Sequence, residues 1–280
     1  DSRTGPYHSV GPFTQVLGPF ESVRVIASDT AITPYDRSTG ASRTTTLMGR
    51  AVLEASREAI DQMVRMAADS LKVKEKEIEV IRGGIHCGEA SLTWSEVLTR
   101  YYGLPDGEVI GRAYIRKSGD FAKLPVFWEA AATAVEISVD EETGQIRMER
   151  LGTSGDVGLA INPALAEGQD IGAATMGMGI GLFEELIYDG PQMVNGSLLE
   201  YRVPRFSDLP PDVQLHLVQN RDGVGPYGAK GGGEASLNAM AANVANALYA
   251  ATGVRIRSAP LTPEKVWRAL KEARGEKKKS

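Results

Sequence analysis

The sequence predicts an α+β fold of mixed sheets and packed helices, because helix and strand patterns follow one another without regular βαβ alternation. Three stretches carry this prediction. Apolar residues recur at helical spacing over residues 47–67. Apolar and polar residues alternate over residues 131–139, and a turn at 140–144 with a return over 145–151 indicates a β-hairpin. A second helix is expected over residues 236–252, directly after a glycine-rich stretch.

The remaining elements are expected from shorter patterns. Thr93 and Glu96 form a capping box that opens a helix ending near Tyr101. An irregular stretch over residues 103–125 suggests a boundary between two subdomains, 1–124 and 125–280. Strands are expected over residues 23–27, 78–81, 198–203 and 213–218, a turn at Asp189-Gly190, and helices over 164–186 and after Thr262.

Small residues form a stripe on the predicted helix over residues 164–186. Ala173, Gly177 and Gly181 share one face at a spacing of four. A helix with so many glycines is weakened by up to about 1 kcal/mol for each glycine relative to alanine. The stripe therefore indicates that another helix or a ligand packs closely against this face.

Composition limits the classes of function. The chain has 280 residues, is 42% hydrophobic and carries a net charge of −5, so we expect a globular protein without a nucleic-acid-binding surface. Cys87 is the only cysteine, which excludes an internal disulfide and an iron–sulfur cluster held by this chain. His86 and Cys87 are expected in a turn, and the three histidines match no zinc spacing. We therefore expect no metal bound directly by the protein, although an organic cofactor could bring one.

No run is long and apolar enough to cross a bilayer, and no signal peptide is visible. We therefore predict a cytoplasmic protein without a membrane span.

The stretch 223–237 places six glycines and a proline ahead of Glu234. Glycine costs backbone entropy on folding, so such a cluster needs a physical reason. One interpretation is close approach of the backbone to a bulky ligand, to which Glu234 is the one charged group delivered. The other is a flexible loop, with Glu234 as an ordinary first-turn carboxylate favoured by the helix dipole.

A second junction lies at the start of the helix over residues 47–67. Residues 39–45 offer several hydroxyl groups and the guanidinium of Arg43. The free amides of a helix N-terminus bind phosphate well. Hydroxyl residues at this position also cap helices, so ordinary N-capping with Arg43 in solvent is the alternative.

Four segments, residues 39–52, 155–172, 196–204 and 228–255, together resemble the molybdenum-binding subunit of the xanthine dehydrogenase and aldehyde oxidoreductase family. The resemblance runs over residues 20–270 and covers only the C-terminal half of the family's molybdenum region, which suggests a half-subunit or a fragment. It implies two molybdopterin-binding-type subdomains, the second with the catalytic glutamate. The chain has Gly-Glu-Ala-Ser where the family commonly has Gly-Glu-Pro-Pro, and no pterin role is carried onto Gln15.

The resemblance implies a role for particular residues. Glu234 matches the family's general base and Gln169 matches a glutamine that hydrogen-bonds the pterin. The other implied cofactor-binding residues are Ala41, Ser42, Arg43 and Thr44, with Gly231, Gly232 and Gly233 letting the backbone pass the metal closely.

The implied activity is oxidative hydroxylation of an electron-poor carbon in an N-heterocycle, purine or aldehyde, with water as the oxygen source; CO is a further possible substrate. The implied cofactor is molybdopterin with molybdenum, in the cytosine dinucleotide form. The implied partners are a second molybdopterin-binding half-subunit and subunits carrying 2Fe-2S clusters and FAD, which remove the electrons. The alternative is a cofactor-cradling or assembly subunit, or a non-redox relative, without a catalytic role of its own.

Overall fold

The computed structural model describes residues 22–26, 29–35, 39–105, 107–115 and 128–275. The chain forms two compact units, which are described separately. The first unit comprises Asp1–Phe127 and Arg221–Gly231, and the second comprises Trp128–Asn220 and Gly232–Ser280. Helices and mixed sheets occur together, so the α+β prediction is confirmed. Most of the glycine-rich stretch belongs to the first unit, although it follows most of the second unit in the sequence.

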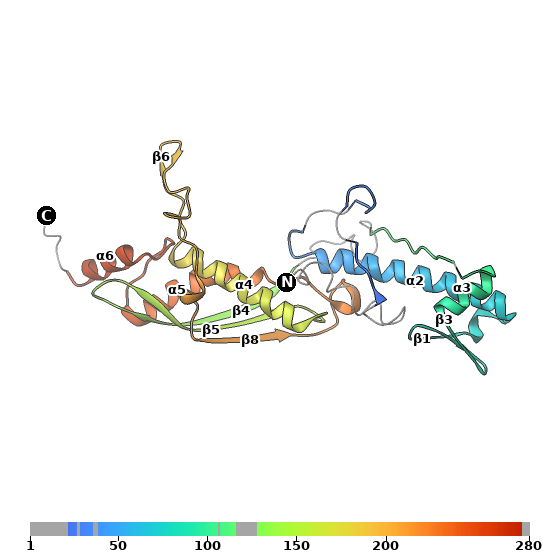
Figure 1. The fold of residues 1–280 in the computed structure, drawn as a ribbon. Coiled ribbons are helices and arrows are strands. Elements are labelled where there is room, and N and C mark those ends of the chain that lie inside the picture. Colours follow the sequence, from blue (N-terminus) through green and yellow to red (C-terminus); the bar gives the residue numbers. More distant parts are fainter. Residues whose placement is uncertain (1–21, 27–28, 36–38, 106, 116–127, 276–280) are drawn as a thin grey trace. The chain divides into compact units, whose positions relative to one another are not determined.

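The first unit is built on the long helix α2 (Thr44–Leu71), with a small sheet and helix α3 (Trp94–Tyr102) at its C-terminal end (Figure 1). A 3₁₀ turn, η4 (Glu75–Glu77), leads into the antiparallel strands β1 (Glu79–Ile81), β2 (Gly84–Cys87) and β3 (Ala90–Thr93). Thr93 Oγ1 accepts a hydrogen bond from the Glu96 amide and the Glu96 side chain accepts one from the Thr93 amide, so the predicted capping box is confirmed. The buried residues of this unit are Met63, Ala67, Ile85, Trp94 and Val97.

The expected turn at His86-Cys87 is wrong. Both residues lie in β2, and His86 Nδ1 lies 2.9 Å from Ser91 Oγ of β3. The turns fall instead on either side of β2, where Gly83 and Gly88 have φ values of +81° and +60°. Within the described parts of the chain, no group of three acidic, histidine or cysteine side chains could hold a metal ion.

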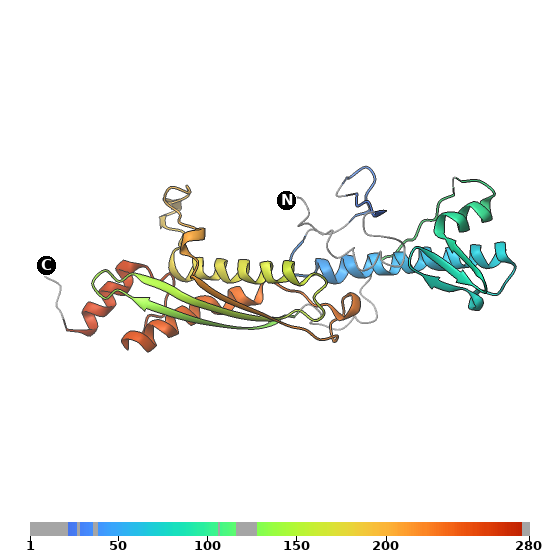
Figure 2. The same ribbon diagram turned by 60° about the horizontal axis from the view of Figure 1, so that its bottom comes forward.

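The second unit is a three-stranded sheet with helices α4 (Pro163–Leu182) and α5 (Ala235–Thr252) packed on one of its faces (Figures 1 and 2). The strands β4 (Ala130–Val139) and β5 (Ile146–Asp156) form the predicted hairpin, and β8 (Asp212–Val218) pairs with β5 in parallel.

A two-stranded hairpin, β6 (Tyr188–Asp189) and β7 (Gln192–Met193), turns at Gly190 as predicted and projects away from the main sheet (Figure 1). The 3₁₀ turn η6 (Phe206–Asp208) follows, and the unit ends in α6 (Pro263–Ala273). Another 3₁₀ turn, η7 (Pro226–Gly228), belongs to the first unit.

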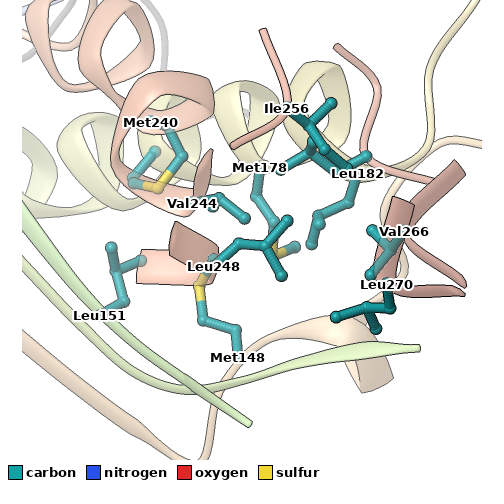
Figure 3. Close-up of a cluster of buried hydrophobic side chains, with 12 residues drawn as sticks. Met148, Leu151, Met178, Leu182, Met240, Val244, Leu248, Ile256, Val266 and Leu270 are labelled. Carbon is teal, nitrogen blue, oxygen red and sulfur yellow. The ribbon is translucent and has the colours of Figure 1, made fainter. Parts of the chain in front are cut away.

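The core of the second unit lies between the sheet and the helices (Figure 3). Leu151, Thr153 and Gly155, which alternate along β5, are buried, as expected for a strand covered on one face. The buried side chains of this core are Met148, Leu151, Ala174, Met178, Leu182, Met240, Val244, Leu248, Ile256, Leu261, Val266 and Leu270.

No helix in the described residues has the length and hydrophobicity needed to cross a membrane.

Two predicted strands are wrong. Residues 198–200 form a turn, in which the amides of Glu200 and Tyr201 donate to Ser197 O. The apolar content that suggested a strand is on the surface, since Leu198 is 81% and Leu199 97% exposed. Residues 23–26 pair with no strand among the described residues, and residue 27 lies outside them.

The small-residue stripe of α4 packs against a helix. A Cβ atom on Gly177 would lie 2.6 Å from Leu237 O and 2.6 Å from Met240 Cβ, both in α5. A Cβ on Gly181 would lie 3.2 Å from Ala241 Cα of the same helix. The stripe therefore lets two helices approach at backbone distance, which was one of its two expected roles.

We predict that Gly177→Ala destabilises the protein, whereas Gly172→Ala does not. Alanine favours helix by up to about 1 kcal/mol over glycine, and a Cβ on Gly172 meets nothing within 4 Å. At Gly177 the new Cβ would overlap backbone, which typically costs about 1–3 kcal/mol. Urea unfolding of both variants checks this, and equal effects at the two positions would contradict the packing role.

Candidate functional site

The loop before Gly231 is a hydrogen-bonded turn of the first unit. The Gly223 amide donates to Gly228 O at 3.2 Å and the Gly225 amide donates to Ala229 O at 3.0 Å. Lys230 Nζ lies 2.8 Å from Asp222 Oδ1, although the Lys230 side chain is only 6% exposed. These contacts account for much of the glycine content, because Cβ atoms at Gly223 and Gly225 would overlap Ala229 O at 2.3 Å and 2.5 Å.

Gly231 brings this turn against the loop that precedes α2. A Cβ atom on Gly231 would lie 2.6 Å from Ser42 O, so only glycine fits there without movement. Ala41 and Ser42 both have left-handed backbones, with φ values of 56° and 48°, which is uncommon for residues other than glycine. The first unit therefore places Gly231 beside the predicted cofactor-binding residues 41–44.

The N-cap residue of α2 does not cap the helix with its own side chain. Arg43 is the N-cap residue and makes no side-chain cap hydrogen bond, and the Thr44 hydroxyl instead contacts Thr39 Oγ1 at 3.2 Å. Ordinary N-capping by a hydroxyl residue is therefore not what the structure shows. Thr46, in the first turn, is only 1% exposed, yet its Oγ1 has no hydrogen-bond partner among the described residues. A helix N-terminus beside a buried hydroxyl without a described partner suits an anionic group that accepts hydrogen bonds.

In the second unit, Gln169 lies next to Gly233, which directly precedes Glu234. Gly233 has a φ of +92°, and a Cβ atom there would lie 2.8 Å from Gln169 Cβ. The side chains of Gln169 and Glu234 are both exposed. Gly232 lies against Val157, with Cγ1 3.0 Å from the position of an added Cβ. The second unit thus places the predicted pterin-binding glutamine beside the predicted base.

The sequence did not reveal Glu129, which holds the first turn of α5. Its Oε1 accepts the Gly233 amide at 3.1 Å, and its Oε2 accepts the amides of Glu234 and Ala235, each at 3.3 Å. Glu234 is the N-cap residue of α5 and makes no side-chain cap hydrogen bond of its own. A carboxylate from outside the helix therefore satisfies donors that a helix start otherwise leaves unpaired.

Burial raises the pKa of the Glu129 carboxyl, and the nearby Asp170 adds to this, while the three amide hydrogen bonds oppose it. A carboxyl whose pKa is higher in the folded than in the unfolded protein binds more protons when folded. Its contribution to the free energy of unfolding therefore decreases as the pH rises through the interval between the two values.

The sequence also did not reveal a buried polar network beneath the same turn. Asp170 of α4 is completely buried, and its Oδ1 accepts the Ser236 hydroxyl at 2.9 Å. Thr153 of β5 donates to Asp170 Oδ2 at 3.3 Å, and its Oγ1 lies 2.6 Å from Ser236 Oγ. Gly155 leaves room for the carboxylate, which would lie 3.0 Å from a Cβ there. The network links α4, α5 and β5 at the level of Gln169 and Glu234.

A signal for Asp170 was present in the sequence. Asp170, Ala173 and Gly177 fall on one helix face at spacings of three and four, so Asp170 extends the small-residue stripe. A carboxylate on a face that packs against another helix requires hydrogen-bond donors there. No comparable local pattern pointed to Glu129.

A family profile described as the molybdopterin cofactor-binding domain matches residues 13–210. The chain belongs to this family. Among its relatives, the probable hypoxanthine oxidase XdhD of Escherichia coli is 30% identical over 258 residues, which are 91% of this chain and 26% of XdhD. The nicotine 6-hydroxylase large subunit of Paenarthrobacter nicotinovorans is 32% identical over 269 residues, which are 91% of this chain and 32% of that subunit.

Solved structures of oxidoreductases share the fold. Quinoline 2-oxidoreductase from Pseudomonas putida 86 superposes with a TM-score of 0.82 at 24% identity, over 97% of this chain and 36% of that one. The Cu,Mo-CO dehydrogenase gives a TM-score of 0.82 at 22% identity, over 98% of this chain and 35% of that one. The family profile and the relatives together confirm the resemblance to the xanthine dehydrogenase and aldehyde oxidoreductase family, and the solved structures show that the fold is shared. The molybdopterin-binding chain spans about a quarter to a third of the curated relatives it matches.

We predict that Glu129→Gln flattens the pH dependence of stability. From the ordinary carboxyl pKa of 4.5 up to its raised value, Glu129 lowers the free energy of unfolding as the pH rises. Glutamine does not titrate, so the stability of the wild type relative to E129Q should fall across this interval and level off above it. Urea unfolding at a series of pH values checks this, and a difference that rises with pH would contradict it.

Proposed function

We propose that this chain is the part of a molybdenum hydroxylase that carries the general base and pterin-binding residues. The observation that carries the proposal is the placement of Gln169 beside Gly233 and Glu234 in a chain of the molybdopterin-binding family. Glu234 is the proposed base and Gln169 the proposed pterin ligand. In the first unit, residues 41–44 and Gly231 are proposed to bind cofactor phosphates or pterin.

The described residues fit such a cofactor. A pterin with phosphate groups needs hydrogen-bond donors and acceptors along an open surface. Gln169 supplies an exposed amide, and added Cβ atoms at Gly168 and Gly172, next to it on α4, would meet nothing within 4 Å. The start of α2 supplies backbone amides, and Thr46 supplies a buried hydroxyl without a partner among the described residues. These donors match the phosphate groups of a molybdopterin, for which we propose the cytosine dinucleotide form.

When bound, the molybdenum–pterin group would supply the two-electron redox chemistry. The chain's own contribution is the Glu234 carboxylate, which accepts a proton from the water that provides the oxygen atom. Positioned base catalysis of this kind contributes about 10²–10⁴-fold to the rate. The proposed substrate is a small molecule with an electron-poor carbon, in an N-heterocycle, a purine or an aldehyde.

The proposed partners follow from what this chain lacks. One cysteine cannot bind an iron–sulfur cluster, so electrons must leave through other protein. We propose subunits carrying 2Fe-2S and FAD, together with the remainder of the molybdenum-binding protein. Relatives in multi-subunit enzymes support this, since their names include a molybdenum-binding subunit, a complex subunit gamma and a large subunit.

We predict that Glu234→Gln in the assembled enzyme lowers turnover by about 10²–10⁴-fold and leaves the molybdenum content unchanged. Glutamine keeps the size of the side chain and removes its capacity to accept a proton. Steady-state kinetics and metal analysis of the same preparation check this. Glu272→Gln, an exposed carboxylate of α6, is the matched control and should have no effect.

Gln169→Ala distinguishes cofactor binding from catalysis. We predict that it reduces the molybdenum content of the enzyme and leaves the turnover per bound molybdenum nearly unchanged. Full activity with molybdenum retained in E234Q would contradict the role as base and support a cradling subunit. A purified wild-type complex without molybdenum would support an assembly role instead.

A further inference from the structure

The first turn of α5 is held from outside the helix by a carboxylate far away in the sequence. Glu129 directly precedes β4, and the amides that it binds are 104 to 106 residues further along the chain. Its two oxygens bind three successive amides, which include that of Glu234 itself. The first turn of α5 has no acidic residue after the N-cap Glu234, so Glu129 adds a negative charge where the helix dipole favours one.

Two neighbouring contacts fix the same turn. Gly233 lies against Gln169, with a φ that side chains rarely adopt, and Ser236 is tied to Asp170 by a 2.9 Å hydrogen bond. Residues 233–236 are thus held at every position by Glu129, Gln169 or Asp170. The Glu234 side chain is exposed, whereas the backbone that carries it is bonded to a half-buried acid.

This arrangement distinguishes the starts of α5 and α2. An amide that donates to Glu129 is not available to an incoming phosphate. The start of α2 has no such internal carboxylate among its described contacts. The contacts at the start of α5 therefore fix the backbone of Glu234 and do not bind a ligand.

We propose that Glu129 is a positioning residue for Glu234: it fixes the backbone of residues 233–235 and thereby the place from which the base acts. The proposal rests on the proposed function of Glu234. A base must lie within hydrogen-bond reach of the proton that it removes, and a displacement of about 1 Å can cost about 10²-fold in rate. Loss of the anchor should therefore reduce kcat much more than it changes KM.

The test uses the assembled enzyme with Glu129→Gln and Glu129→Ala. Glutamine keeps one acceptor oxygen and the side-chain volume, whereas alanine removes both oxygens. Amide hydrogen exchange over residues 233–235 should accelerate in the order wild type, Gln, Ala, by at least about tenfold for Ala. The kcat should fall in the same order, by about 10–100-fold for Ala, with KM and molybdenum content nearly unchanged.

Glu136→Ala is the matched control. Glu136 lies on β4, and its carboxylate meets Arg150 at 3.4 Å with both side chains largely exposed, so exchange and kcat should stay at wild-type values. Unchanged exchange in E129A would overturn the anchor, whatever the activity. If E129A shows faster exchange but a wild-type kcat, while E234Q is inactive, the positioning role of Glu129 is overturned and the proposed base is retained. If E234Q is fully active, the proposed base is overturned, and the exchange result still shows whether Glu129 anchors residues 233–235.

Discussion

The arrangement of the second unit depends on one buried carboxylate. Asp170 is completely excluded from solvent and takes hydrogen bonds from hydroxyl groups on α5 and β5. A buried carboxylate left without partners costs several kcal/mol, so the two helices and the strand must meet where Ser236 and Thr153 can reach it. Gly177 and Gly181 allow the helices to come that close, and Gly155 leaves space for the carboxylate.

The same constraint explains why residues distant in the sequence become neighbours. Gln169 precedes Asp170, and Glu234 lies two residues before Ser236. The hydrogen bond between Asp170 and Ser236 therefore brings Gln169 close to Glu234. Glu129 then binds the amides of residues 233–235 from the start of β4. Glu129 and Asp170 thus hold the turn that carries the proposed base. Polar networks of this kind are rigid when every member is satisfied.

Periodicity in the sequence predicted the elements that bury a face. The helix α2 and the strand β4 carry a repeat that follows from covering one side with protein. The strand expected at residues 198–203 failed because apolar content alone suggested it, and Leu198 and Leu199 are on the surface. The parallel pairing of β8 with β5 joins segments separated by the whole of α4, so no local pattern could predict it.

Some residues of the candidate site could likewise be identified from local sequence patterns, whereas others could not. Glu234, Gln169 and the glycines could be identified because they occur in recognisable local segments. The glycines, however, meet protein at every position from 231 to 233, namely Ser42, Val157 and Gln169. Close passage of the metal past these glycines remains a prediction, whereas close passage of chain segments is observed. Glu129 could not be found from sequence, since its partners are backbone amides, which have the same chemistry in every residue.

The most direct test of this account is a double-mutant cycle on Asp170 and Ser236. The free energy of unfolding is measured for the wild type, Asp170→Asn, Ser236→Ala and the double variant. Hydrogen bonds to charged groups contribute about 1.5–3 kcal/mol, and residues in one network couple by about 0.5–3 kcal/mol. We expect a coupling energy within that range and faster amide exchange at residues 233–236 in both single variants. Additive effects with unchanged exchange would contradict the claim that Asp170 holds the turn that carries Glu234.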